Sequence, residues 1–326
     1  MRQQSSDIMS PTAAVESGRR PAPRSRAIEM ATAWIRHRRD ARIRPDMETA
    51  DQVLDRLVAR HTAGEAVGNV VVVVAHPDDE AIGAGAVLRG VPNVTIVHAT
   101  DGAPADDEYA QTRGFDSRAS YARARRTETI AALGVIGIPE TRIRNLGITD
   151  GETAWKMVEL CHAVRDILDE LNPDVVLTHP YEGGHSDHDS TALAVHLAVG
   201  LIQRDRGCAP VILELTSYHN YNGRRRRFSF LPALGTRVRT RVLSAADRRV
   251  KRQVFELFQS QRSTLQSFSL EVERFRQAPR YLFTVPPHEG QLDYERLCPR
   301  MTGAEWRAQA ERALQLLRTK EQFRGI

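Results

Sequence analysis

The chain has 326 residues, of which 41% are hydrophobic and 27% are charged, with a formal net charge of +5. Its longest apolar runs are far shorter than the roughly 20 residues that span a bilayer, so no membrane span is expected. Three widely spaced cysteines without a CxxC pair argue against a disulfide framework or a thiolate zinc site. Because no apolar secretory signal follows the first basic residues, we expect a cytoplasmic protein.

Positive charge is concentrated at the N-terminus. Residues 1–44 contain ten Arg and four acidic residues, and the stretch MSPTAAVESGRRPAPRSR has few large apolar residues. Such a segment cannot bury enough surface to fold. We therefore predict that residues 1–66 form a basic extension, partly disordered, with short helices such as TADQVLDRLVARH. A second basic run, residues 224–227, is expected on an exposed loop, where it could hold an anionic group of a substrate.

From residue 68 onward, short apolar runs alternate with helical periods. Strands are predicted at residues 69–75, 93–100, 173–180 and 211–218, and helices at residues 117–134, 157–171 and 190–202. Val-rich segments such as NVVVVVA are typical of parallel strands covered on both faces. The alternation predicts an α/β fold: a doubly wound, Rossmann-like, mostly parallel sheet with helices on both faces. Residues 67–326 are predicted to be one domain, with its core at 68–220 and a less regular covering segment at 221–326.

The turn after the first strand carries an unusual density of charge. VVVVAHPDDEAIG (71–83) places an imidazole and three carboxylates where such folds bind their ligands, beyond the carboxyl end of a strand. Gly83 and Gly85 provide only part of a G-x-G-x-x-G motif, because Leu88 occupies the third position. Carboxylates at this place would also repel a pyrophosphate. The pattern therefore argues against a dinucleotide and favours a cation.

A second polar cluster, HPYEGGHSDHDS (179–190), follows another predicted strand at the same edge of the sheet. His76 and Asp79 are three residues apart in the first cluster, as are His185 and His188 in the second. Two His and one carboxylate with open coordination positions suit a catalytic Zn²⁺, and they also suit a non-haem Fe²⁺. Several neighbouring polar residues are interpreted as helix caps or structural residues: Ser186, Asp187, Asp189, His162, His179 and His196.

The two clusters resemble the motifs of a known family. AHPDDE followed by GGHSDHD is similar to the LmbE-like or PIG-L-like zinc-dependent N-deacetylases, whose motifs are AHPDDE and HPDH. TDGAP (100–104), RARRTETIAALGV (123–135) and NLGITDGE (145–152) follow in that family's order, so the resemblance covers about residues 68–220. SQRSTLQSF and ERFRQAPRYLFTVPPHEGQLDYE further resemble long bacterial members. Ser186 stands where the family usually has Pro, between functional positions.

The resemblance implies roles for the residues of both clusters. His76, Asp79 and His188 would hold the metal, Asp78 would be the general base, and His185 would be an acid or electrophile. A metal with an open position lowers the pKa of a bound water to about 7. A carboxylate next to a ligand can then accept the proton of that water.

The resemblance also points to residues around the metal. Arg125 and Asp150 correspond to substrate-binding positions, although both also suit surface salt bridges. Glu80 and Glu182 are interpreted as partners that orient metal ligands.

These inferences predict a Zn²⁺-dependent hydrolase that removes the N-acetyl group from an N-acetylated amino sugar, such as N-acetylglucosamine, or from a sugar conjugate. Fe²⁺ or another divalent ion is the alternative cofactor. The alternative functions are hydrolysis of a bulkier amide, Fe²⁺-dependent oxidation, and nucleic-acid binding through the Arg-rich arm. RNP and zinc-finger signatures are absent, which disfavours a nucleic-acid partner. The expected partner is a small N-acetylated molecule, and the sequence makes no prediction of oligomeric state.

Overall fold

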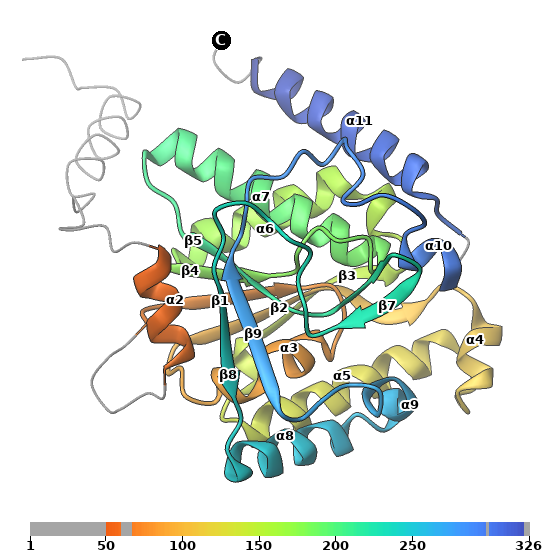
Figure 1. The fold of residues 1–326 in the computed structure, drawn as a ribbon. Coiled ribbons are helices and arrows are strands. Elements are labelled where there is room, and N and C mark those ends of the chain that lie inside the picture. The colour runs from red at the N-terminus through yellow and green to blue at the C-terminus, as the bar shows by residue number, and fades with distance from the viewer. Residues whose placement is uncertain (1–49, 60–66, 298–299, 323–326) are drawn as a thin grey trace, which may run out of the picture. The chain divides into compact units, whose positions relative to one another are not determined.

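The computed structural model describes residues 50–59, 67–297 and 300–322, all within one compact unit, Glu48–Ile326. Its centre is a seven-stranded sheet with the strand order β3-β2-β1-β4-β5-β9-β8 (Figure 1). The strands are β1 (Val70–Val74), β2 (Val94–Pro104), β3 (Ile143–Asp150), β4 (Val175–Thr178), β5 (Val211–Leu215), β8 (Val238–Val242) and β9 (Val272–Gln277). β1 to β5 are parallel, whereas β8 and β9 are antiparallel additions at one edge. The predicted fold class is therefore confirmed.

Helices cover both faces of the sheet (Figure 1). One face carries α2 (Ala50–Val58), α3 (Asp79–Leu88), α5 (Arg118–Val135) and α8 (Ala245–Leu257). The other carries α6 (Met157–Leu171), α7 (Ser186–Arg206) and α11 (Gly303–Gln322). The remaining helices are short: α4 (Asp107–Thr112), α9 (Arg262–Leu265), α10 (Asp293–Leu297) and the 3₁₀ turns η1 (Glu140–Arg142), η2 (Thr153–Trp155) and η3 (Gln259–Gln261). None of the helices in these described ranges is both long and apolar enough to cross a membrane.

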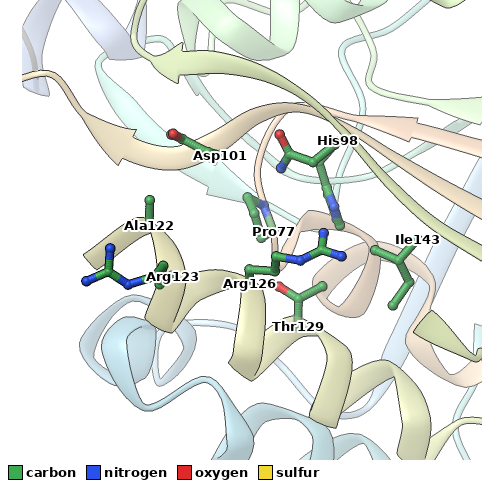
Figure 2. Close-up of a pocket in the computed structure, with 9 residues that line it drawn as sticks. Pro77, His98, Asp101, Ala122, Arg123, Arg126, Thr129 and Ile143 are labelled. Atoms are coloured by element: carbon green, nitrogen blue, oxygen red, sulfur yellow. The ribbon is translucent and has the colours of Figure 1, made fainter. Parts of the chain in front are cut away.

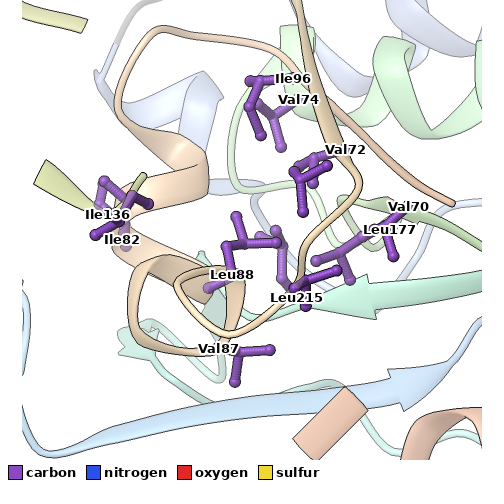
Figure 3. Close-up of a cluster of buried hydrophobic side chains, with 14 of the residues drawn as sticks. Val70, Val72, Val74, Ile82, Val87, Leu88, Ile96, Ile136, Leu177 and Leu215 are labelled. Atoms are coloured by element: carbon purple, nitrogen blue, oxygen red, sulfur yellow. The ribbon is translucent and has the colours of Figure 1, made fainter. Parts of the chain in front are cut away.

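The run of valines in β1 supplies side chains to both layers of the core. Because successive side chains of a strand point to opposite faces, Val70, Val72 and Val74 join the cluster in Figure 3, under α3. Val71 and Val73 join the second cluster, under α6 and α7. All five valines are buried, which explains why the strand is continuously apolar rather than alternating.

The strand order reverses at one point of the sheet. β1 pairs with β2 on one side and with β4 on the other, so the order reverses between β1 and β4. Open α/β sheets bind ligands at such a reversal, outside the carboxyl ends of the strands. Both polar clusters, residues 76–80 and 179–190, begin there.

The segment after residue 220 is more regular than the sequence analysis predicts. Residues 224–227, predicted as an exposed loop, form the strand β7 (Arg224–Arg227), which pairs with β6 (Tyr218–Tyr221) in a two-stranded sheet. β9 reads VERFRQ and carries the buried charged residues Glu273 and Arg276. Burial of charged side chains hides this strand from a search for apolar runs.

Most of the predicted N-terminal extension lies outside the described residues, and its boundary remains a prediction. The described part contains α2, as the sequence suggests. Leu54 and Leu57 of this helix are fully buried in the core cluster.

A buried ion pair joins α3 to the antiparallel strands. Lys251 of α8 and Glu273 of β9 are both fully buried, with Nζ 2.7 Å from Oε1. Lys251 also donates to the carbonyl of Ile82, and Glu273 accepts from the backbone N–H groups of Ala86 and Val87. Because α3 begins with Asp79, this pair also fixes the helix that carries part of the first polar cluster.

Replacing one member of this pair should be costly. Lys251→Met leaves the Glu273 carboxylate buried without its counter-charge, and removal of one partner of a buried ion pair typically costs about 3–5 kcal/mol. Urea unfolding should show this loss of stability. Lys156→Met is the matched control, because the Lys156–Glu152 pair is largely exposed and such pairs contribute about 0–1 kcal/mol. Equal stabilities of the two variants would contradict the structural role of Lys251.

Candidate metal centre and active site

The two polar clusters meet at the carboxyl edge of β1 and β4. His76 Nδ1 lies 3.3 Å from Asp79 Oδ2, and His188 Nε2 lies 3.3 Å from both His76 Nδ1 and Asp79 Oδ1. His76 and Asp79 come from the turn after β1, whereas His188 comes from the first turn of α7. All three side chains are buried. The structure therefore brings together the three residues that the sequence analysis names as metal ligands.

The donor atoms of this group suit a divalent ion. Ligand atoms bound tetrahedrally at about 2.0–2.1 Å lie about 3.3 Å apart, which matches the spacing of the three residues. Burial lowers the pKa of His188 to about 4, so its imidazole is neutral and can act as a ligand. Burial opposes ionisation of Asp79, but His188 and His179 outweigh it and hold the pKa of this carboxyl well below its usual value. Together with His76, the residues His188 and Asp79 provide two imidazoles and one carboxylate, a donor set typical of zinc sites.

The second ring nitrogen of His76 faces two carboxylates. Nε2 lies 3.1 Å from Asp150 Oδ1 and 3.3 Å from Asp187 Oδ2. Burial opposes a positive charge on His76, but Asp150 and Asp187 raise its pKa well above the usual value. Metal-ligating histidines usually donate their other N–H to a carboxylate, which fixes the ring and its tautomer. This arrangement leaves Nδ1 of His76 as the nitrogen that faces Asp79 and His188.

A second possible ligand group consists of His76, His185 and Asp187. Its carboxylate is already occupied, because Asp187 accepts from the Gly151 N–H at 2.7 Å and the Thr153 hydroxyl at 2.6 Å. These bonds fix Asp187 as a support for His76. The group with Asp79 and His188 is therefore the better candidate for the ion.

Asp78 lies beside the candidate ligands and is held by Arg125. The guanidinium lies 3.3 Å from Asp78 Oδ2 and also donates to the carbonyls of Pro77 and Gly102. Asp78 has a backbone φ of +153°, which is sparsely populated for a residue with a side chain. A Cβ at Gly102 would lie 2.8 Å from Pro77, so only glycine allows this close approach. The whole turn is thus packed around Arg125.

The environment of Asp78 suits proton exchange near neutrality. Burial raises the pKa of Asp78 to about 7, although Arg125 favours the ionised form. A general base is most effective when its pKa lies near the working pH. The carboxyl is therefore electrostatically suited to accept and release a proton.

His185 is placed to donate a hydrogen bond. It caps α7, with its Nδ1 accepting from the backbone N–H of Asp187 at 3.1 Å. In the neutral ring the proton then lies on Nε2, an assignment made from this hydrogen bond. Burial and the nearby His76 lower the pKa of His185 to about 4, so the neutral form predominates.

The two predicted substrate-binding residues occupy different environments. Arg125 is buried, and both of its terminal nitrogens are hydrogen bonded. The side chain of Asp150 retains 18% exposure and contacts His76. Neither placement tests a substrate-binding role, which remains a prediction for both residues.

For three residues, the structure adds contacts that the sequence interpretation did not include. His179, assigned there to structure, accepts from the Ala75 N–H at 3.0 Å, in keeping with that assignment; it also lies 3.3 Å from Asp79 and stacks on His188 with ring centroids 4.0 Å apart. Glu80 pairs with His98 instead of orienting a ligand. Glu182 lies 2.9 Å from His219 and 3.3 Å from Arg276, and so anchors the second polar cluster to the covering segment. His179 directly follows β4, and this position was the sequence feature that could have placed it near the candidate ligands.

A cavity of about 270 Å³ lies behind the first turn, between α5 and the sheet (Figure 2). Pro77 is the only residue of the H-P-D-D-E turn among its lining residues, which include His98, Arg126 and Thr129. None of the three candidate ligands lines it. This cavity is therefore distinct from the candidate metal centre.

Residues 71–199 match the family model for PIG-L, described as GlcNAc-PI de-N-acetylase. A probable N-acetyl-alpha-D-glucosaminyl L-malate deacetylase 2 of Bacillus cereus is 32% identical over 154 residues, covering 44% of this chain and 66% of that protein. A 1D-myo-inositol 2-acetamido-2-deoxy-alpha-D-glucopyranoside deacetylase of Mycobacterium sp. strain KMS is 32% identical over 158 residues, covering 41% and 51%. The chain thus spans just under two thirds and about half of the lengths of these relatives.

A solved structure shares the fold. The antimicrobial reagent A40926 pseudoaglycone deacetylase Dbv21 superposes with a TM-score of 0.50 at 21% identity, covering 65% of this chain and 98% of that one. The matched family segment contains both polar clusters and the strands that carry them. Over residues 71–199, which hold both polar clusters, the chain is similar to the PIG-L, LmbE-like family.

Proposed function

We propose that the chain is a Zn²⁺-dependent hydrolase that removes the N-acetyl group from an amino sugar or a sugar conjugate. The observation that carries the proposal is the convergence of His76, Asp79 and His188 beside a carboxyl group, Asp78, that is not among these ligands. A metal-binding triad with a separate general base is an arrangement that catalyses amide hydrolysis. The deacetylase activities after which the Bacillus and mycobacterial relatives are named support an N-acetylated sugar conjugate as the substrate.

His76, Asp79 and His188 would hold the ion, which when bound activates water and polarises the amide carbonyl. Asp78 accepts the proton of the attacking water, and Arg125 holds its carboxyl group in place. Nε2–H of His185 donates to the oxygen that becomes negative as the carbonyl is attacked. The C–N bond then breaks as Asp78 passes the proton that it accepted from the water to the amine, and the products are acetic acid, which ionises to acetate, and a free amine.

Asp150 and Arg125 are proposed to contact the substrate, as the family resemblance implies. Asp150 is partly exposed beside His76, so one of its oxygens can face a sugar hydroxyl. Arg125 has, in addition, the role of positioning Asp78. A bulkier amide remains the alternative substrate, and Fe²⁺ remains the alternative metal.

Loss of the proposed base should abolish turnover without loss of the metal. Asp78→Asn keeps the size of the side chain but removes its basicity, so amine release from N-acetylglucosamine conjugates should fall by about 10²–10⁴-fold. Elemental analysis should find the same metal content as in the wild-type protein. Asp116→Asn, at an exposed position, is the matched control. Wild-type turnover by Asp78→Asn would remove this residue from the mechanism.

The support that Asp187 gives to His76 should be measurable as metal affinity. Asp187→Asn replaces a carboxylate by a weaker acceptor at Nε2 of His76, so Zn²⁺ affinity should fall by about 10–100-fold. Competition with a chromophoric chelator measures this affinity without any substrate. Asp166→Asn, on the exposed side of α6, should bind Zn²⁺ like the wild-type protein.

Removing and restoring the ion tests whether the reaction requires a metal. Removal of the ion by a chelator should stop acetate release, and Zn²⁺ should restore it; restoration by Fe²⁺ alone would favour the alternative metal. An apo-protein with full activity would contradict the proposed function.

A further inference from the structure

The hairpin of β6 and β7 lies directly against the second polar cluster. A Cβ at Gly184 would come within 1.9 Å of the carbonyl oxygen of Tyr218, so glycine is required where the loop bearing His185 meets β6. The ring of Tyr218 packs edge-on against His188, with centroids 5.5 Å apart. The hairpin therefore forms a wall beside the candidate metal centre, and residues 224–227, which the sequence analysis considered for an anionic group of a substrate, form its second strand.

Two arginines of the hairpin lie over a row of rings that starts at the metal centre. The row consists of His188, Tyr218 and Phe268, with Tyr218 and Phe268 centroids 6.1 Å apart. Cζ of Arg225 lies 4.9 Å from the Tyr218 centroid, and Cζ of Arg227 lies 5.8 Å from the Phe268 centroid. The strand register pairs Tyr218 directly with Arg227, so the two side chains share one face of the hairpin.

The positive charge of this face is only partly neutralised. Arg225 donates to Asp293 through Nε at 2.7 Å and lies 2.6 Å from it through Nη2. Within the described residues, Arg227 has no carboxylate within ion-pair distance. Its side chain is half-buried rather than fully solvated. A guanidinium that is partly desolvated, stacked on a ring and unpaired is well suited to bind an oxyanion.

We propose that Arg227, with Arg225 beside it, recognises an anionic group, a carboxylate or a phosphate, on the part of the substrate attached to the N-acetyl sugar. The inference rests on the proposed function for the position of the acetamide at the metal centre. With the acetamide there, the rest of the substrate extends along Tyr218 toward the two guanidinium groups. The hairpin would thus select among sugar conjugates by charge.

The test compares three ligands that share the sugar and differ in the attached group. These are the methyl glycoside of N-acetylglucosamine, its carboxymethyl glycoside, and N-acetylglucosamine 1-phosphate. The wild-type enzyme should deacetylate at least one charged ligand with a kcat/KM about 10-fold or more above that of the methyl glycoside. The carboxymethyl and phosphate arms distinguish the two kinds of anion.

Arg227→Gln should remove this preference while leaving kcat/KM for the neutral methyl glycoside unchanged. Arg226→Gln is the matched control, because Arg226 is exposed, lies one residue away and projects from the opposite face of the hairpin, with His219. It should keep the wild-type preference. Arg225→Gln is less suitable, because it would also leave Asp293 buried without its partner.

Calorimetric titration of the Zn²⁺-loaded protein with the same ligands separates this inference from the proposed reaction. If no ligand is deacetylated but a charged one binds more tightly, and Arg227→Gln alone loses that binding, the anion site stands and the reaction fails. If the methyl glycoside is deacetylated and binds as well as both charged ligands, the reaction stands and the anion site is overturned. If Arg226→Gln lost the preference for charged ligands as fully as Arg227→Gln, the anion site would also be overturned. The preference would then depend on the total positive charge of the hairpin and not on Arg227.

Discussion

The structure depends on how three carboxylates are buried in one turn. Asp78, Asp79 and Glu80 are consecutive and nearly inaccessible to solvent, and burial of like charges is unfavourable unless each finds a partner. Each carboxylate has its own partner. Asp78 faces Arg125, Asp79 faces two histidines, and Glu80 faces His98. These partners come from α5, the residue after β4, α7 and β2, so the charges of the turn connect it to four parts of the fold.

The second polar cluster is held in an equally specific way. Glu182 accepts from the backbone N–H of Leu231 and pairs with His219 and Arg276. Arg276, on β9, also lies 2.7 Å from Glu214 of β5. The covering segment therefore tethers the loop that carries His185. This explains why β9, which lies between β5 and β8, contains a buried arginine instead of an apolar residue.

The sequence was most informative where a short apolar run, which indicates a strand, was followed directly by His and Asp residues. Valine runs indicated β1 and β4, and the carboxyl ends of these strands gave the meeting point of His76, Asp79 and His188. The support residues were harder to predict. Asp187 lies in the first turn of α7, where a carboxylate normally caps the helix; only the approach of Gly151 and Thr153 shows that it turns toward His76. β9 was missed because its charges are buried in pairs rather than exposed.

The candidate metal ligands and the hairpin of β6 and β7 are positioned by different parts of the fold. The candidate metal ligands stand at the ends of parallel strands, where the reversal of strand order dictates which turns can meet. The hairpin of β6 and β7 is outside that sheet, and its side chains are aimed by its own register and by contacts with Tyr218, Phe268 and Asp293. Tyr218 contacts the candidate ligand His188, whereas Arg225 and Arg227 contact rings and Asp293 and not the ligands. A fold organised in this way separates the residues that carry the proposed anion site from the residues of the candidate metal centre.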